Sequence, residues 1–178
     1  YARVGGKEAV FTVPRLLYDR FVGPDLRDRV VFRAVPADQV TRVELKGWGG
    51  LTGTPAELTF EKNKDGVWVT TKSSLGAFTA DPGKVAAFVE MLARERVRSF
   101  ERGVPDVKHG FGDPKQALSA TLHWPGAAAA VNLGAPTDAT ETAYYGWSSL
   151  LPQSDPVFVF DAALFKPFKD KPAGFARQ

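Results

Sequence analysis

The chain has no cysteine, and it has only two histidines and one methionine among its 178 residues. The absence of cysteine excludes disulfide bonds, cysteine-ligated zinc and thiol nucleophiles, but it does not decide the cellular compartment, because many envelope proteins also lack cysteine. No apolar run approaches the roughly 20 residues that a membrane-spanning helix needs, and no charged-then-apolar signal opens the chain. The net charge of +3 and the pI near 9.2 are only mildly basic, which argues against a dedicated nucleic-acid binder.

The sequence does contain enough apolar material for a core. Hydrophobic residues make up 44% and aromatic residues 12% of the chain, so one folded globular domain of ordinary size is expected. No low-complexity linker divides the chain. Because the first residue is Tyr1 and not methionine, we expect the chain to be a piece of a longer parent protein.

The stretch of residues 56–100 organises the rest of the chain. Two runs of alternating apolar and polar residues flank an Asn-Lys-Asp-Gly turn, which predicts a β-hairpin. Asp81 then offers a side-chain acceptor, and Pro82 loses no hydrogen bond at the first position of a helix. An apolar stripe at helical spacing predicts a main amphipathic helix over about 82–96 that packs on one face of a sheet. The stripe consists of Val85, Phe88, Val89 and Leu92.

The predicted fold class is α+β. We expect an antiparallel β-sheet of hairpins, the main helix on one face, and two short helices that begin at Pro14 and Asp161. Loops are expected over 103–114 and, with polar residues, over 134–140. The further predicted strands are residues 1–4, 9–13, 40–46, 97–100, 117–124, 129–133, 143–147 and 157–160.

The two ends of the chain resemble each other. The matched positions, each 147 apart, are Val10 and Val157, Leu17 and Leu164, and Phe21 and Phe168. This spacing is longer than solenoid repeats, so we interpret residues 1–29 as the tail of a preceding repeat unit and residues 30–178 as one α+β unit. Chance similarity of two strand-and-helix segments is the alternative. Because exposed strand edges invite pairing, the N-terminal hairpin is expected to dock on the second unit or to self-associate with another chain.

Six short motifs, in this order, resemble the bacterial domain of unknown function 4340 family over essentially the whole chain. They are residues 65–68, 81–92, 110–114, 131–134, 144–145 and 157–160. The resemblance implies an extracytoplasmic protein of the periplasm or cell envelope, membrane-anchored in its parent and associated with ABC transporters of the gliding-motility type. It implies no cofactor, and it carries over no catalytic residue.

Three aromatic residues are candidates for a ligand or partner surface. Trp48, Tyr145 and Trp147 can line a carbohydrate or peptide groove, where flat rings give contact area at low entropy. Packing in the core is the competing interpretation for each of them. The Gly-Trp-Gly-Gly sequence around Trp48 is not a phosphate loop, because no Lys-Ser/Thr pair follows it.

Arginines form a second candidate surface. Arg94, Arg96, Arg98 and Arg102 make up the densest basic stretch, which can bind polyanions such as lipid headgroups or nucleic acid through phosphate contacts. Interspersed glutamates favour instead a solvated helix end that stabilises the helix dipole. A further basic stretch consists of Lys166, Lys169 and Lys171.

His109 is the third candidate. It lies near Asp106 and Asp113 in a glycine-containing loop, a spacing that a hydrolase or metal site can use, although carboxylates beside a loop histidine are common. His123 falls in a strand and is expected to be half-exposed. The chain lacks a second histidine nearby and a nucleophile elbow.

We therefore expect a noncatalytic extracytoplasmic protein-interaction module, without cofactor or metal, that presents a rigid sheet to a protein partner. Binding of polyanions or glycans through the arginines or tryptophans is the first alternative. A hydrolase with a loop site at His109 is the second.

Overall fold

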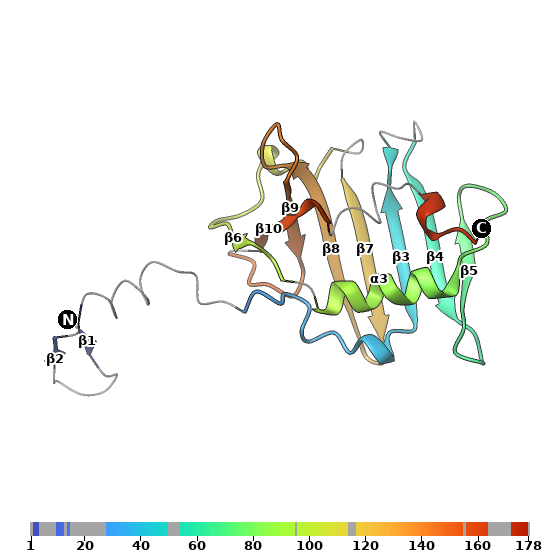
Figure 1. Ribbon diagram of the computed structural model, residues 1–178, viewed down its shortest axis with the longest axis horizontal. Coiled ribbons are helices and arrows are strands. Elements are labelled where there is room, and N and C mark those ends of the chain that lie inside the picture. Colours follow the sequence, from blue (N-terminus) through green and yellow to red (C-terminus); the bar gives the residue numbers. More distant parts are fainter. Residues whose placement is uncertain are drawn as a thin grey trace.

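A computed structural model describes residues 2–3, 10–12, 14, 28–49, 54–94, 96–113, 117–154, 156–163 and 172–177. Its main element is an eight-stranded antiparallel sheet in the order β5-β4-β3-β7-β8-β9-β10-β6, with helix α3 on one face (Figure 1). The α+β class is thus confirmed in outline, with more sheet than helix. The sheet strands are β3 (Arg42–Gly47), β4 (Ala56–Lys62), β5 (Trp68–Ser73), β6 (Ser99–Phe100), β7 (Leu118–Trp124), β8 (Ala127–Pro136), β9 (Ala143–Ser148) and β10 (Val157–Asp161).

The predicted β4–β5 hairpin is confirmed, and its turn is fixed by one side chain. The Asn63 side-chain oxygen accepts hydrogen bonds from the backbone N–H groups of Asp65 and Val67, at 3.0 and 2.9 Å. Gly66 follows at φ +75°, a conformation that favours glycine. The turn brings Lys62 opposite Trp68 in the strand register.

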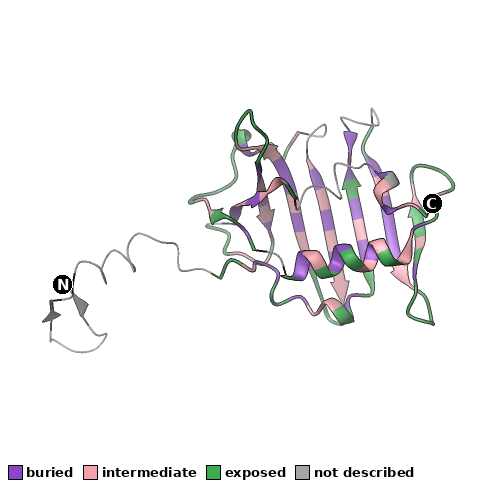
Figure 2. Cartoon of the chain, in the orientation of Figure 1, coloured by how far each residue is buried: buried purple, intermediate pink, exposed green. Residues whose placement is uncertain are grey.

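Helix α3 (Pro82–Arg94) crosses the strands on one face of the sheet (Figure 1). The Asp81 carboxylate caps it by accepting from the N–H groups of Gly83 and Lys84, at 2.8 and 3.3 Å. The predicted apolar stripe is buried beneath the helix, while the outer side is exposed (Figure 2). The helix ends at Arg94, close to the predicted end at about residue 96. Arg96 is not helical, because the chain must become extended for the Arg98 N–H to donate to the Val159 carbonyl of β10.

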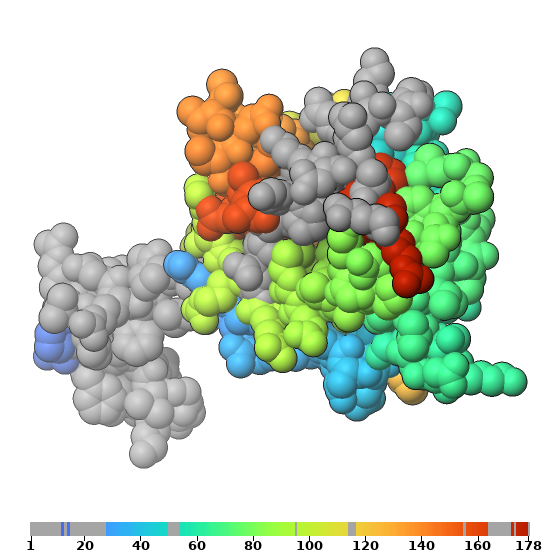
Figure 3. Space-filling view, turned by 45° about the vertical axis from the view of Figure 1, so that its right-hand side comes forward, coloured from blue at the N-terminus to red at the C-terminus, as the bar shows by residue number. Residues whose placement is uncertain are grey.

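The C-terminal turn η3 (Pro172–Phe175) lies beside α3 at the surface of the molecule (Figure 3). The Phe175 ring lies 5.7 Å from that of Phe60 on β4 and 5.4 Å, edge to face, from that of Phe88 on α3. Its carbonyl accepts a hydrogen bond from the Asp81 N–H at 2.8 Å. The C-terminal strap, residues 172–177, is therefore part of the packing between helix and sheet.

The second half of the sheet is a meander of β7, β8, β9 and β10, and β3 joins it to the β4–β5 hairpin. The predicted strands agree with it, except that β8 runs to Pro136. The polar loop expected over 134–140 is therefore wrong for its first three residues. A register shift between Leu133 and Pro136 lets β8 continue past an irregularity while still pairing with β9.

The strands β1 (Ala2–Arg3) and β2 (Val10–Phe11) pair as the predicted N-terminal hairpin and form a separate two-stranded sheet. In their register, Ala2 is opposite Phe11 and Arg3 is opposite Val10. The short helix predicted after Pro14 lies outside the described residues, and so does most of the one after Asp161.

Candidate functional site

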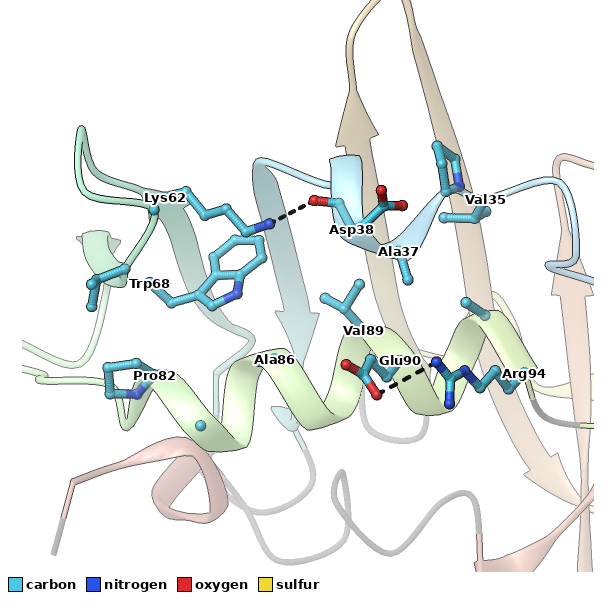
Figure 4. Close-up of a pocket in the computed structure, with 15 residues that line it drawn as sticks. Val35, Ala37, Asp38, Lys62, Trp68, Pro82, Ala86, Val89, Glu90 and Arg94 are labelled. Atoms are coloured by element: carbon cyan, nitrogen blue, oxygen red, sulfur yellow. Dashed lines mark hydrogen bonds and ion pairs between the residues drawn. The ribbon is translucent and has the colours of Figure 1, made fainter.

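A groove of about 830 Å³ runs along α3 (Figure 4). Helix α3 forms one wall, and its lining residues include Gly83, Ala86 and Ala93. Because these residues are small, the space beside the helix stays open. Residues 35–38 form the opposite wall, and the last two of them belong to the short turn η1 (Ala37–Gln39). Because the β4–β5 hairpin closes one end, three separate parts of the chain form the groove.

Trp68 and Lys62 form that closed end of the groove. Trp68 is only 4% exposed, and the Lys62 ammonium lies over its ring, 5.3 Å from the centroid. The same ammonium donates a hydrogen bond to the Asp38 backbone carbonyl at 3.0 Å. Lys62 therefore occupies the ring face on which a sugar would stack, while the indole edge remains directed at the groove (Figure 4).

The far end of the groove is polar. Glu90 and Arg94, one helical turn apart on α3, lie 4.0 Å apart as an exposed ion pair. The charged lining of the groove is thus balanced, with Lys62 and Asp38 at one end and Glu90 and Arg94 at the other.

His109 ends the turn η2 (Val107–His109) and is buried, with 2% exposure. Its Nδ1 accepts the backbone N–H of Asp106 at 2.8 Å, and its Nε2 lies 3.3 Å from Glu101 Oε2. The ring also stacks near Phe111 and meets the Tyr145 ring edge to face at 4.8 Å. Glu101 and Asp106 are thus its carboxylate neighbours, and both ring nitrogens serve to hold the loop.

Two glycines let this loop lie against the sheet. A Cβ on Gly134 of β8 would lie 2.0 Å from the His109 carbonyl oxygen, which is impossible without moving the loop. Gly110 has φ +71°, and a Cβ there would lie 2.9 Å from Ala135. Gly110 and Gly134, from two of the motifs, therefore lie where the loop meets β8, and close backbone packing explains both glycines.

The arginine stretch begins at the end of α3 and continues on both sides of β6. Arg94 pairs with Glu90, and the Arg98 Nε donates to Asp161 Oδ1 at 2.7 Å. That hydrogen bond raises the pKa of the Arg98 guanidinium. Arg96 and Arg102 are exposed, so half of the predicted basic surface is engaged with carboxylates of the chain itself.

The three candidate aromatics do not form one surface. Trp48 is 5% exposed and belongs to the core. Tyr145 and Trp147 are half-buried on β9, which β7 and β8 separate from the β3 strand that precedes Trp48. At about 4.8 Å per strand, that separation is roughly 14 Å.

The sheet face opposite α3 carries half-exposed side chains. We call five of them the open face: Ser119, Thr121, Ala130, Asn132 and Trp147. The register places Asn132 between Ser119 and Trp147, and Thr121 beside Ala130. His123, half-exposed as predicted, continues this face.

Charged residues flank the open face on β3, β4 and β5. Glu57 lies between Lys72 and Lys46, at 2.9 and 3.0 Å. Hydrogen bonds from these two lysines, Lys72 first, lower the pKa of Glu57 to about 2. The flank is therefore a network of paired charges.

Comparison with protein-family models, with curated proteins and with solved structures finds no match. The resemblance to the domain of unknown function 4340 family stays a prediction. The described residues contain no group of three or more His, Asp or Glu side chains placed to hold a metal ion. Within the same part of the chain, no helix has the length and hydrophobicity needed to cross a membrane.

Sequence reasoning missed the groove and the partner of His109. The helical spacing of Gly83, Ala86 and Ala93 was visible, but only the fold shows that no bulky side chain fills the space beside them. Glu101 was visible only as one of several charges, because its contact with His109 depends on how the loop turns.

Proposed function

We propose that this chain is a noncatalytic protein-interaction module that presents the open face to a protein partner. The observation that carries the proposal is the contrast between the two sides of the sheet. On β7, Leu118, Ala120 and Leu122 are buried beneath the helix side, whereas Ser119 and Thr121 on the other side are half-exposed.

The chemistry of the open face suits a protein partner. Trp147 is a half-buried aromatic residue beside Asn132, among small side chains. Tryptophan is enriched among the residues that contribute most of the binding free energy in protein interfaces. Strand pairing on both sides holds these residues in place, so the surface needs little ordering when it binds.

The location of the module is proposed from the sequence resemblance. We place it outside the cytoplasm, anchored through its parent and associated with a transporter complex of the envelope. We also propose that residues 1–29 belong to a preceding unit; the constant offset of 147 that relates Val10 to Val157, Leu17 to Leu164 and Phe21 to Phe168 supports this.

The alternatives receive less support. A hydrolase base must reach its substrate, and His109 is buried with Nδ1 bonded to the backbone. A polyanion site is weakened by the pairing of Arg94 and Arg98 with carboxylates. Retention on heparin at low salt that Arg96→Ala abolishes would favour the polyanion site instead.

Site-specific photocrosslinking in the membrane-anchored parent tests the proposal. A photoreactive residue at Thr121 is expected to give a discrete adduct with a membrane-complex protein, and Trp147→Ala is expected to abolish it. The matched control is Ala87, which is exposed on α3 on the opposite side of the sheet. Equal adducts from both positions, or none from Thr121, would refute the proposal.

A further inference from the structure

The groove along α3 is lined by a hydrogen-bond donor that no described residue uses, the indole N–H of Trp68. The Trp68 side chain is only 4% exposed, but its Nε1 atom is not fully buried, so this N–H opens onto the groove. Among the described residues, none accepts a hydrogen bond from it. Figure 4 shows the indole nitrogen on the side of the ring that faces Val89 and the groove. An acceptor supplied by a ligand fits this position.

Lys62 places a second donor beside the first. Its ammonium carries three N–H donors and donates one hydrogen bond, to the Asp38 carbonyl. The ammonium lies 5.3 Å from the centre of the Trp68 ring, so both donors lie at the same end of the groove. The Asp38 carboxylate points away from Lys62 (Figure 4). One neutral donor and one cation, side by side, suit the two oxygens of a single carboxylate.

The middle of the groove, between its two charged ends, suits an apolar chain. Ala37 and Pro36 form one wall, and Ala86, Val89 and Ala93 form the other. From Pro82 to Arg94 the helix rises about 18 Å, at 1.5 Å per residue. The volume of about 830 Å³ lies within the range of roughly 300–1,000 Å³ that is usual for ligand sites.

We propose that this groove binds the terminal carboxylate of an apolar chain. Trp68 Nε1–H and the Lys62 ammonium hold the carboxylate, and the chain lies between Ala37 and Ala86. A fatty acid and the free C-terminus of an apolar peptide share this chemistry. The site is separate from the open face, and its test does not depend on the proposed protein partner.

The first experiment follows the indole N–H signals of the four tryptophans by ¹H–¹⁵N NMR, with Trp68→Phe assigning the Trp68 signal. Titration with decanoate is expected to shift that signal, and decanol is expected to leave it in place. A second arm compares the peptide Ala-Val-Leu-Val with its C-terminal amide. Binding of decanoate or of the free-acid peptide supports the proposal and identifies the source. No shift with either at millimolar concentration overturns it, as does equal binding of decanol.

The second experiment tests the charge of Lys62. Lys62→Met keeps the length of the side chain and removes the ammonium, so binding is expected to weaken at least about tenfold. Lys64→Met is the matched control, because Lys64 is exposed in the turn of the same hairpin and does not line the groove. Its affinity should stay within about twofold of the parent chain. Equal losses in the two variants would refute the site, and the NMR spectrum of each variant reports whether it is folded.

Discussion

Replacing Phe175 by alanine is expected to destabilise the protein although the residue lies close to the C-terminus. The Phe175 ring is 2% exposed and packs between the rings of Phe60 and Phe88. Truncation of a buried phenylalanine costs about 3–5 kcal/mol through lost transfer free energy and the cavity left behind. For a chain of this length, each kcal/mol lowers Tm by roughly 2–4 °C. We therefore expect Tm to fall by about 6–20 °C.

Urea unfolding followed by circular dichroism measures this loss at constant temperature. The midpoint should fall while the m-value stays unchanged, because the folded and unfolded surfaces remain similar. Arg177→Ala is the matched control in the same strap: Arg177 is exposed and its backbone N–H, which donates to Thr79, is retained. That variant should stay within about 0.5 kcal/mol of the parent. A loss below about 1 kcal/mol for Phe175→Ala would mean that the strap is not part of the core.

Four further outcomes follow from the structure. Gly134→Ala should lower the free energy of unfolding, measured in urea, by about 1–3 kcal/mol, because the added Cβ displaces the loop that contains His109. Gly112→Ala should be nearly neutral, because a Cβ there meets nothing within 4 Å. Asp81→Ala should cost about 1 kcal/mol by loss of the helix cap, and equal stability would contradict the capping role. Deletion of residues 1–27 should change the free energy of unfolding by less than about 0.5 kcal/mol if they belong to a preceding unit; a larger loss would show that they pack on this one. The pKa of Glu57 is lowered to about 2, so its stabilising contribution should be fully present above the ordinary pKa near 4.5 and should be lost as pH falls toward 2. An NMR titration of the Glu57 carboxyl carbon measures this pKa, and Glu57→Gln should remove the pH dependence of stability.

The local elements could be predicted from the sequence because their causes are local. The alternation in β4, the cap at Asp81 and the stripe that includes Val85 and Phe88 each lie within a few residues and follow a fixed period. The same reasoning gave the direction of burial for β4 and α3, whereas on β5 Trp68 is buried and Val69 on the alternate side is exposed.

Contacts between distant residues could not be predicted in this way. Phe60 and Phe175 lie far apart in the sequence, and periodicity does not say which buried ring meets which. For the same reason, the sequence does not show that Trp48 lies in the core. It also does not show that Glu101, and not Asp113, is the carboxylate in contact with His109 Nε2. Sequence spacing constrains neighbours along the chain, whereas these contacts depend on how the sheet is ordered.

The meeting of the two glycine motifs bears on what this chain does. A motif that serves chemistry leaves a reactive group accessible, whereas one that serves packing brings backbone close to backbone. Here the His109 carbonyl lies where a Cβ of Gly134 would be, and the His109 ring is closed in by Phe111 and Tyr145. The residues that give the sequence its most distinctive pattern are therefore used to fasten a loop to β8 and β9. Because none of these residues lines the groove along α3, binding there can vary without disturbing this fastening.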